Sequence, residues 1–257
     1  MVDLDKYVLG TPCWVELATT DIAAARAFYG DLFGWQFNEG PLPDGGVYVI
    51  PHLRDRSVAG MYEQRGDQRH APPHWLLYVS VNDVDDTASR ITALGGSLTG
   101  APVDVMESGR MAVLQDPTGA AVALWQARKA IGSRVVNEPG AFSWAELATR
   151  DPGRAAEFYC GLFGWSADVK GDGHYTEYLD EDRVVAGMLT MDERFGDAPP
   201  HWLTYFGVSD CDGAAALVGS KGGGVDMPPS DIPNGGRVAV VSDPQGARFA
   251  VWTGTPT

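Results

Sequence analysis

The chain has 257 residues, 44% of them hydrophobic, which is comfortable for two domains of about 125 residues each. It carries 19 basic and 34 acidic side chains, and the net charge of −15 disfavours binding to nucleic acid or to an anionic membrane surface. No apolar run approaches the roughly 20 residues of a membrane span, and no secretory signal is recognisable. We therefore expect a cytoplasmic protein that binds neither nucleic acid nor membrane.

The chain contains an internal repeat. The segment WVELATTDIAAARAFYGDLFGW at 14–35 recurs as WAELATRDPGRAAEFYCGLFGW at 144–165, with 13 of 22 positions identical. Three further matches follow in the same order: VAGM, APPHW, and a segment that reads GRMAVLQDPTGAAVALW and then GRVAVVSDPQGARFAVW. The offset is 130 residues at first and 127 afterwards. We therefore predict two homologous units, 1–130 and 138–257, joined by a linker near 127–140.

The first half of each unit is predicted to begin with a strand and a helix. Residues 14–19 alternate in the manner of a strand, and Asp21 follows as a helix N-cap. In the second copy the cap is followed by proline, at Asp151–Pro152, which is a favoured helix start. Short strand segments are expected next, at 47–50 and 58–62.

The second half of each unit repeats this pattern. A strand is predicted at 74–81, and Asp83 caps a second helix that ends at Gly95–Gly96. The tetrapeptide Asp-Pro-Thr-Gly at 116–119 has proline and glycine where a type I turn favours them. This turn joins the last two strands, at 110–115 and 121–126. Each unit therefore reads as two βαβββ modules, which makes four modules in the chain.

Paired βαβββ modules with "D…AFYGDLFGW" after the first strand and "DPTG" or "DPQG" before the last resemble the vicinal oxygen chelate superfamily. That group includes glyoxalase I, extradiol dioxygenases, fosfomycin-resistance enzymes and bleomycin-sequestering proteins. The resemblance extends from about Trp14 to Trp252 and is strongest to the fused two-unit branch labelled glyoxalase-like or hydroxylase. It implies an α+β fold in which curved mixed sheets surround ligand cavities and helices cover the convex side.

Strand alternation then selects the side chains that face each cavity. Glu16 and Glu146 are predicted to point inward, where a carboxylate is rarely buried without a partner. We expect them to be acid–base residues with raised pKa values, with His74 and His201 as proton partners. The same faces carry the expected ligand-binding aromatics Trp14, Tyr78, Trp125, Trp144, Tyr205 and Trp252. The alternative is structural: aromatic side chains that fill a core, and carboxylates that order the sheet.

The resemblance also implies where a metal would be bound. Metal-using relatives place a ligand on the first strand, a histidine at the start of the fifth strand, and a carboxylate on the last strand. The corresponding residues are Trp14, His74 and Ala123 in the first unit, and Trp144, His201 and Ala250 in the second. Two of the three ligands are therefore missing from each unit, and a catalytic metal normally needs three protein ligands. We expect no metal and no other cofactor.

Three hypotheses for the function remain. The first is a metal-independent protein that sequesters or tailors a flat aromatic or carbonyl-containing small molecule. The second is a metal-dependent lyase, isomerase or dioxygenase of the glyoxalase type, in which Glu16 and Glu146 replace the missing ligands. The third is an interaction protein with vestigial cavities. The internal pseudo-dimer is expected to be a monomer or a weak homodimer, and which modules pair is left open.

Overall fold

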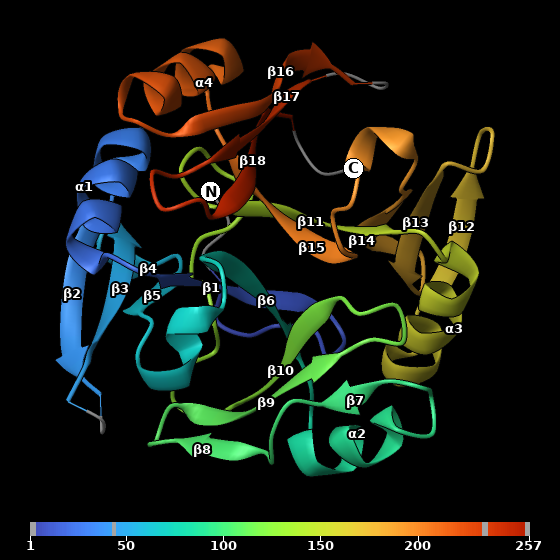
Figure 1. Cartoon of the computed structure of the whole chain (residues 1–257). Coiled ribbons are helices and arrows are strands. Elements are labelled where there is room, and N and C mark those ends of the chain that lie inside the picture. Colours follow the sequence, from blue (N-terminus) through green and yellow to red (C-terminus); the bar gives the residue numbers. More distant parts are fainter. Residues whose placement is uncertain (1–3, 43–44, 233–235, 255–257) are drawn as a thin grey trace.

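The computed structural model describes residues 4–42, 45–232 and 236–254, and it contains two mixed β-sheets, one from each half of the chain (Figure 1). The elements of the first half are β1 (Pro12–Thr19), α1 (Ile22–Phe33), β2 (Gln36–Pro41), β3 (Val47–Leu53), β4 (Arg56–Ser57), β5 (Gly60–Glu63), β6 (His74–Ser80), α2 (Val84–Ile91), β7 (Ser97–Leu98), β8 (Val103–Val105), β9 (Gly109–Gln115) and β10 (Ala121–Ala127), with a 3₁₀ turn at Gly66–His70. Those of the second half are β11 (Phe142–Thr149), α3 (Pro152–Phe163), β12 (Ser166–Lys170), β13 (Tyr175–Asp180), β14 (Arg183–Thr190), β15 (His201–Gly207), α4 (Cys211–Ser220), β16 (Gly224–Asp231), β17 (Arg237–Ser242) and β18 (Arg248–Thr253), with a 3₁₀ turn at Glu193–Phe195. The repeated order confirms the predicted α+β fold of paired modules.

The two modules of each unit join through their first strands. In the first sheet β1 pairs antiparallel with β6 and parallel with β5, and β10 pairs parallel with β6. In the second sheet β11 makes the same pairs with β15 and β14, and β18 with β15. Modules therefore pair within a unit, which settles the point that the sequence left open.

Aspartate caps start the helices as predicted. The Asp21 carboxylate accepts hydrogen bonds from the backbone N–H groups of Ala23 and Ala24, and α1 ends at Gly34, whose φ of 70° is left-handed. Several boundaries differ from the prediction: the strand expected at 58–62, for example, is β5 (Gly60–Glu63). The helix after Asp83 ends at Ile91, and hydrogen-bonded turns fill the remaining residues up to Gly95. The edge strand β2 has no buried residue, so its sequence lacks the alternation that would predict a strand.

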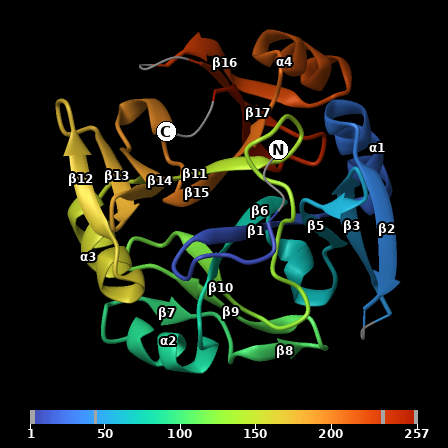
Figure 2. The same cartoon turned by 180° about the vertical axis from the view of Figure 1, so that it is seen from behind.

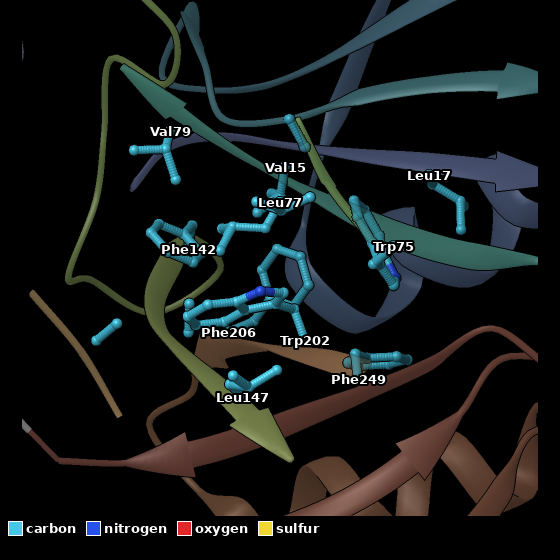
Figure 3. Close-up of a cluster of buried hydrophobic side chains, with 14 of the residues drawn as sticks. Val15, Leu17, Trp75, Leu77, Val79, Phe142, Leu147, Trp202, Phe206 and Phe249 are labelled. Atoms are coloured by element: carbon cyan, nitrogen blue, oxygen red, sulfur yellow. The ribbon is translucent and has the colours of Figure 1, made fainter. Parts of the chain in front are cut away.

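A single hydrophobic core lies between the two sheets (Figure 3). Val15 and Leu77 of the first sheet face Phe206 and Leu147 of the second, and Leu17 belongs to the same core. The helices pack into the same layer in pairs from different units, with α1 beside α4 and α2 beside α3 (Figures 1 and 2). The opposite face of each sheet carries a separate, smaller apolar cluster. These two outer faces therefore point away from each other.

The repeated aromatic and DPxG motifs hold the two units together. The Tyr29 hydroxyl of α1 donates to Asp243 Oδ2 at 3.0 Å, and the Tyr159 hydroxyl of α3 donates to Asp116 Oδ2 at 2.9 Å. The other oxygen of Asp116 accepts the N–H groups of its own turn, at Thr118, Gly119 and Ala120. Each DPxG turn is thus closed internally and bonded to the other unit. We call these two contacts the interlock.

No helix within the described ranges is long and apolar enough to cross a membrane.

Candidate functional site

The outer face of the first sheet is arranged in rows that cross the strands. On β1, Trp14 lies opposite Tyr78, Glu16 opposite Leu76, and Ala18 opposite His74 of β6. Directly opposed residues of a β-ladder point to the same face, so the alternate residues of β1 face outward together. Trp14, Glu16 and His74 are each half-buried, which leaves part of each side chain accessible.

Glu16 lies between two tyrosine hydroxyls. The Tyr48 hydroxyl donates to Glu16 Oε2 at 2.6 Å, and the Tyr78 hydroxyl donates to Oε1 at 2.7 Å. The Trp14 indole N–H donates to the Tyr48 oxygen at 3.3 Å, so Trp14 belongs to the same hydrogen-bond network as Glu16. One carboxyl group therefore connects β1 to β3 and β6 through side chains alone. We call this group the carboxyl–phenol cluster.

The second unit builds the same cluster from equivalent residues. The Tyr205 hydroxyl donates to Glu146 Oε1 at 2.9 Å. Tyr175, the counterpart of Tyr48, has its hydroxyl beside Gly187, as does the Trp144 indole nitrogen, and the charge of Glu146 contributes to raising the pKa of Tyr175. The structure therefore brings the predicted residues Trp14, Glu16 and Tyr78 together in one unit and Trp144, Glu146 and Tyr205 together in the other.

Tyr48 and Tyr175 are site residues that the sequence reasoning missed. Each reaches its carboxyl group by crossing over a glycine of the VAGM motif: a Cβ at Gly60 would overlap the Tyr48 hydroxyl, and one at Gly187 would overlap that of Tyr175. A signal was present in the sequence, because the two tyrosines recur at the 127-residue offset, as do the two glycines. The repeated VAGM therefore marks a close approach between strands.

Burial sets the protonation of the cluster. The loss of solvent raises the pKa of Glu16 and of Glu146, although the tyrosine hydrogen bonds act to lower it. Burial and the nearby carboxylate together raise the pKa of Tyr48, Tyr78 and Tyr205 well above the usual tyrosine value. The phenols therefore stay neutral donors, and the carboxyl group holds its proton to a higher pH than a solvated glutamate. The predicted direction of the glutamate shifts is confirmed.

The two histidines differ from the expectation that they are direct proton partners of the glutamates. His74 Nδ1 lies 2.9 Å from the Pro72 carbonyl oxygen, and His201 Nδ1 lies 2.8 Å from that of Pro199. A carbonyl can only accept, so Nδ1 carries the hydrogen and Nε2 of the neutral ring is an acceptor. The hydrogen bonds to Glu16 come from tyrosines instead. His74 makes no hydrogen bond to Glu16, and a charge on its ring would lower the pKa of Glu16 only through space.

Tryptophans close one side of each cluster. Trp125 packs edge-on against Tyr78, with ring centroids 6.3 Å apart, and its indole N–H donates to the Ala130 carbonyl at 2.9 Å. Trp252 packs in the same way against Tyr205, also at 6.3 Å. Its buried indole nitrogen has no hydrogen-bond partner among the described residues.

Two surface hollows, of about 330 and about 210 Å³, lie away from the carboxyl–phenol clusters, the larger beside Thr118 and Arg154 and the smaller beside Tyr7 and Gln126. Trp14, Glu16 and His74 are half-buried, so a ligand of the first cluster would lie against partly accessible side chains.

The donor groups at the metal positions of related proteins do not fit a divalent ion. Trp14, His74 and Ala123 supply a single metal-binding atom, and both Glu16 oxygens already accept tyrosine hydrogen bonds. No group of three or more His, Cys, Asp or Glu side chains is placed to hold a metal within the described part of the chain. Indole and methyl groups are not metal ligands.

The chain is a tandem paired-module protein. It has two units of two βαβββ modules, and each unit carries one carboxyl–phenol cluster on its outer face. The family model of the Glyoxalase/Bleomycin resistance protein/Dioxygenase superfamily matches residues 12–124 and again 141–251. The chain belongs to this superfamily, which confirms the resemblance seen in the sequence.

Relatives match along nearly the whole chain. It is 41% identical over 256 residues to "Putative glyoxylase CFP32" of Mycobacterium bovis, covering 98% of this chain and 97% of the relative. It is 34% identical over 262 residues to the "Anthracycline biosynthesis protein DauV" of Streptomyces sp. strain C5, covering 96% and 94%.

Solved structures share the fold at low sequence identity. The 2,3-dioxygenase LapB of Pseudomonas sp. KL28 superposes with a TM-score of 0.67 at 16% identity, over 97% of this chain and 94% of the other. The Mn(II)-bound glyoxalase of Novosphingobium aromaticivorans gives 0.66 at 15% identity, over 95% and 82%.

Proposed function

We propose that this protein binds a flat aromatic small molecule bearing carbonyl or hydroxyl oxygens, without a metal, at its two carboxyl–phenol clusters. The observation that carries the proposal is the half-buried carboxyl group of Glu16, held between two phenols and beside an indole, together with its counterpart Glu146, which accepts from Tyr205 in the second unit. A flat ring can stack on the indole, which adds about 0.5–1.5 kcal/mol beyond burial of area. The phenols and the carboxyl group then select the ligand's oxygens.

The named relatives support this class of ligand. The protein DauV carries a name that places it in anthracycline biosynthesis, and so does DnrV of Streptomyces peucetius, at 33% identity. An anthracycline has a flat, fused ring system with quinone and hydroxyl oxygens. Such a molecule matches a face that offers aromatic surface together with neutral hydrogen-bond donors.

The cluster can also move a proton. When Glu16 is protonated, it donates to one phenol, and that phenol can then donate its own hydrogen outward to a ligand carbonyl. When Glu16 is ionised, both phenols turn back toward it. A raised glutamate pKa therefore extends the pH range over which an outward donor is available, which suits general acid catalysis in tailoring and hydrogen bonding in sequestration.

A titration of tryptophan fluorescence tests the proposal. Trp14, Trp125, Trp144 and Trp252 line the two outer faces, so a flat quinone such as emodin should quench the emission with saturation. A Trp14→Phe/Trp144→Phe variant should lose most of that quenching. A short-chain hemithioacetal is the contrasting probe, and binding confined to glutathione derivatives would favour a glyoxalase reaction. No saturable binding of any compound would leave the outer faces vestigial.

A glyoxalase-type metalloenzyme is the second candidate, because the name of the 41% identical relative contains the word glyoxylase. On this reading Glu16 and Glu146 would replace missing ligands, and each would first have to give up its tyrosine hydrogen bonds. No step of such a reaction follows from the donor groups present.

Metal content separates the two candidates. We expect elemental analysis of the purified protein to find no stoichiometric Zn²⁺, Ni²⁺, Mn²⁺ or Fe²⁺, because one imidazole at each site cannot hold such an ion tightly. One ion per unit, released in His74→Ala or His201→Ala, would contradict this prediction.

Glu16→Gln and Glu146→Gln should each weaken quinone binding by about 10- to 150-fold while the fold persists, since a hydrogen bond to a charged group is worth roughly 1.5–3 kcal/mol. The expected pH effect on stability follows from the raised pKa. The protonated glutamate stabilises the fold below its unfolded pKa of about 4.3, and this stability is lost as pH rises through the folded value. Glutamine does not titrate, so the variants should gain stability relative to the wild type as pH rises.

Thermal melting at several pH values and ligand titration measure the two effects separately. A lower melting temperature with unchanged quinone binding would show that these carboxyl groups are architectural.

A further inference from the structure

The two carboxyl–phenol clusters differ at one position of the same row. In the first unit Tyr62 of β5 lies opposite Ala18, and on its other side it pairs with Tyr48. In the second unit Leu189 of β14 takes that place, opposite Ala148 and paired with Tyr175. The strand register is identical, so the difference is one of side-chain chemistry alone.

Tyr62 shares its row with His74. Both residues lie opposite Ala18, one on each neighbouring strand, so their backbones are roughly 10 Å apart on one face. Both side chains are half-buried. Because Nδ1 of His74 is bonded to the Pro72 carbonyl, its Nε2 is left as an acceptor. The Tyr62 hydroxyl has no hydrogen-bond partner among the described residues, so a donor and an acceptor flank the same stretch of β1.

The carboxyl group of Glu16 also acts on the Tyr62 hydroxyl. Burial and the charge of Glu16 raise its pKa to about 12, so its hydroxyl stays protonated as a donor across the physiological range. The second unit keeps the acceptor, His201, with Nδ1 bonded to the Pro199 carbonyl, but Leu189 supplies no donor. A ligand hydroxyl placed over Ala18 could accept from Tyr62 and donate to His74, whereas over Ala148 it could only donate.

We infer that Tyr62 is a specificity-determining residue, which makes the first unit a site that prefers aromatic ligands with a hydroxyl group and leaves the second unit without that preference. This inference rests on the proposed function, because it assigns the two sites of that function to different ligands. A polar group left without a partner in such a site is costly, and for this reason a single hydroxyl can discriminate between otherwise identical molecules.

The test uses two probes that differ by one hydroxyl, 2-hydroxyanthraquinone and anthraquinone, titrated by calorimetry with a two-site fit. In the wild type we expect one site to prefer the hydroxylated probe and the other to show no preference. Tyr62→Phe removes only the hydroxyl oxygen and should weaken binding of 2-hydroxyanthraquinone at the first site about fivefold, with anthraquinone unchanged. Tyr62→Phe/Leu189→Tyr should transfer the preference to the second site.

Leu189→Phe is the matched control, because it adds the ring without the hydroxyl and should create no preference. Equal weakening of both probes in Tyr62→Phe, or an unchanged ratio of their affinities, would overturn the inference while the proposed function stands. If neither quinone binds the wild type, the proposed function itself is overturned, and the inference with it.

Discussion

Asp243→Ala should lower the free energy of unfolding by about 3 kcal/mol. Asp243 belongs to the interlock on the inner side of the protein, away from both carboxyl–phenol clusters. One carboxylate oxygen accepts the Tyr29 hydroxyl of the other unit at 3.0 Å, and the other accepts the N–H groups of Gln245 and Ala247, both at 2.9 Å. Each buried donor left without a partner costs about 1–3 kcal/mol. The Tyr29 hydroxyl also accepts from the Trp75 indole at 3.0 Å, so the loss of Asp243 should also disturb the packing of Trp75 in the shared core.

The reciprocal variant Asp116→Ala should cost a similar amount, because Asp116 accepts the Tyr159 hydroxyl and the amides of its own turn. Tyr29→Phe deletes only one hydroxyl group of the interlock and should cost about 1 kcal/mol. Denaturant unfolding of each variant, with the exposed Asp182→Ala as control, measures these differences. Unfolding of Asp243→Ala at the wild-type midpoint would mean that the interlock contributes nothing.

Gly60→Ala should abolish ligand binding at the first unit and leave the second unit intact. The added methyl group would overlap the Tyr48 hydroxyl and lie 3.1 Å from the Trp14 indole nitrogen. The phenol must then move off Glu16, and the carboxyl group loses one of its two tyrosine partners. Overpacking of this kind costs about 1–3 kcal/mol, so we expect a moderately less stable protein that binds one quinone per chain instead of two.

Gly187→Ala should do the same at the second unit, where the methyl group would overlap the Tyr175 hydroxyl. Gly219→Ala in α4 is the matched control, because its added methyl group meets no atom within 4 Å. Calorimetric stoichiometry distinguishes the three variants. Two full-affinity sites in Gly60→Ala would show that the Tyr48 contact is irrelevant to binding.

Local signals in the sequence were enough to predict most elements of this architecture. The repeat predicted two units, and the aspartate caps, the left-handed glycine after the helix and the DPxG turns placed most elements, because these signals act within a few residues. Strand alternation placed Glu16 and Trp14 together on one face of β1, since period-two geometry needs no tertiary information. The edge strand β2 was missed because a strand with no buried residue has no such alternation.

Contacts between strands and between units, in contrast, depend on how the whole chain folds. Tyr48 reaches Glu16 over Gly60 because β3, β5 and β1 are neighbours in the sheet, and the order of strands is not encoded in local periodicity. The interlock joins Tyr29 to Asp243 across 214 residues, and it exists because the inner apolar faces of both sheets must be buried against each other. Burial of one face of each sheet thus leaves the other face, with its half-buried carboxyl–phenol cluster, on the outside of the protein.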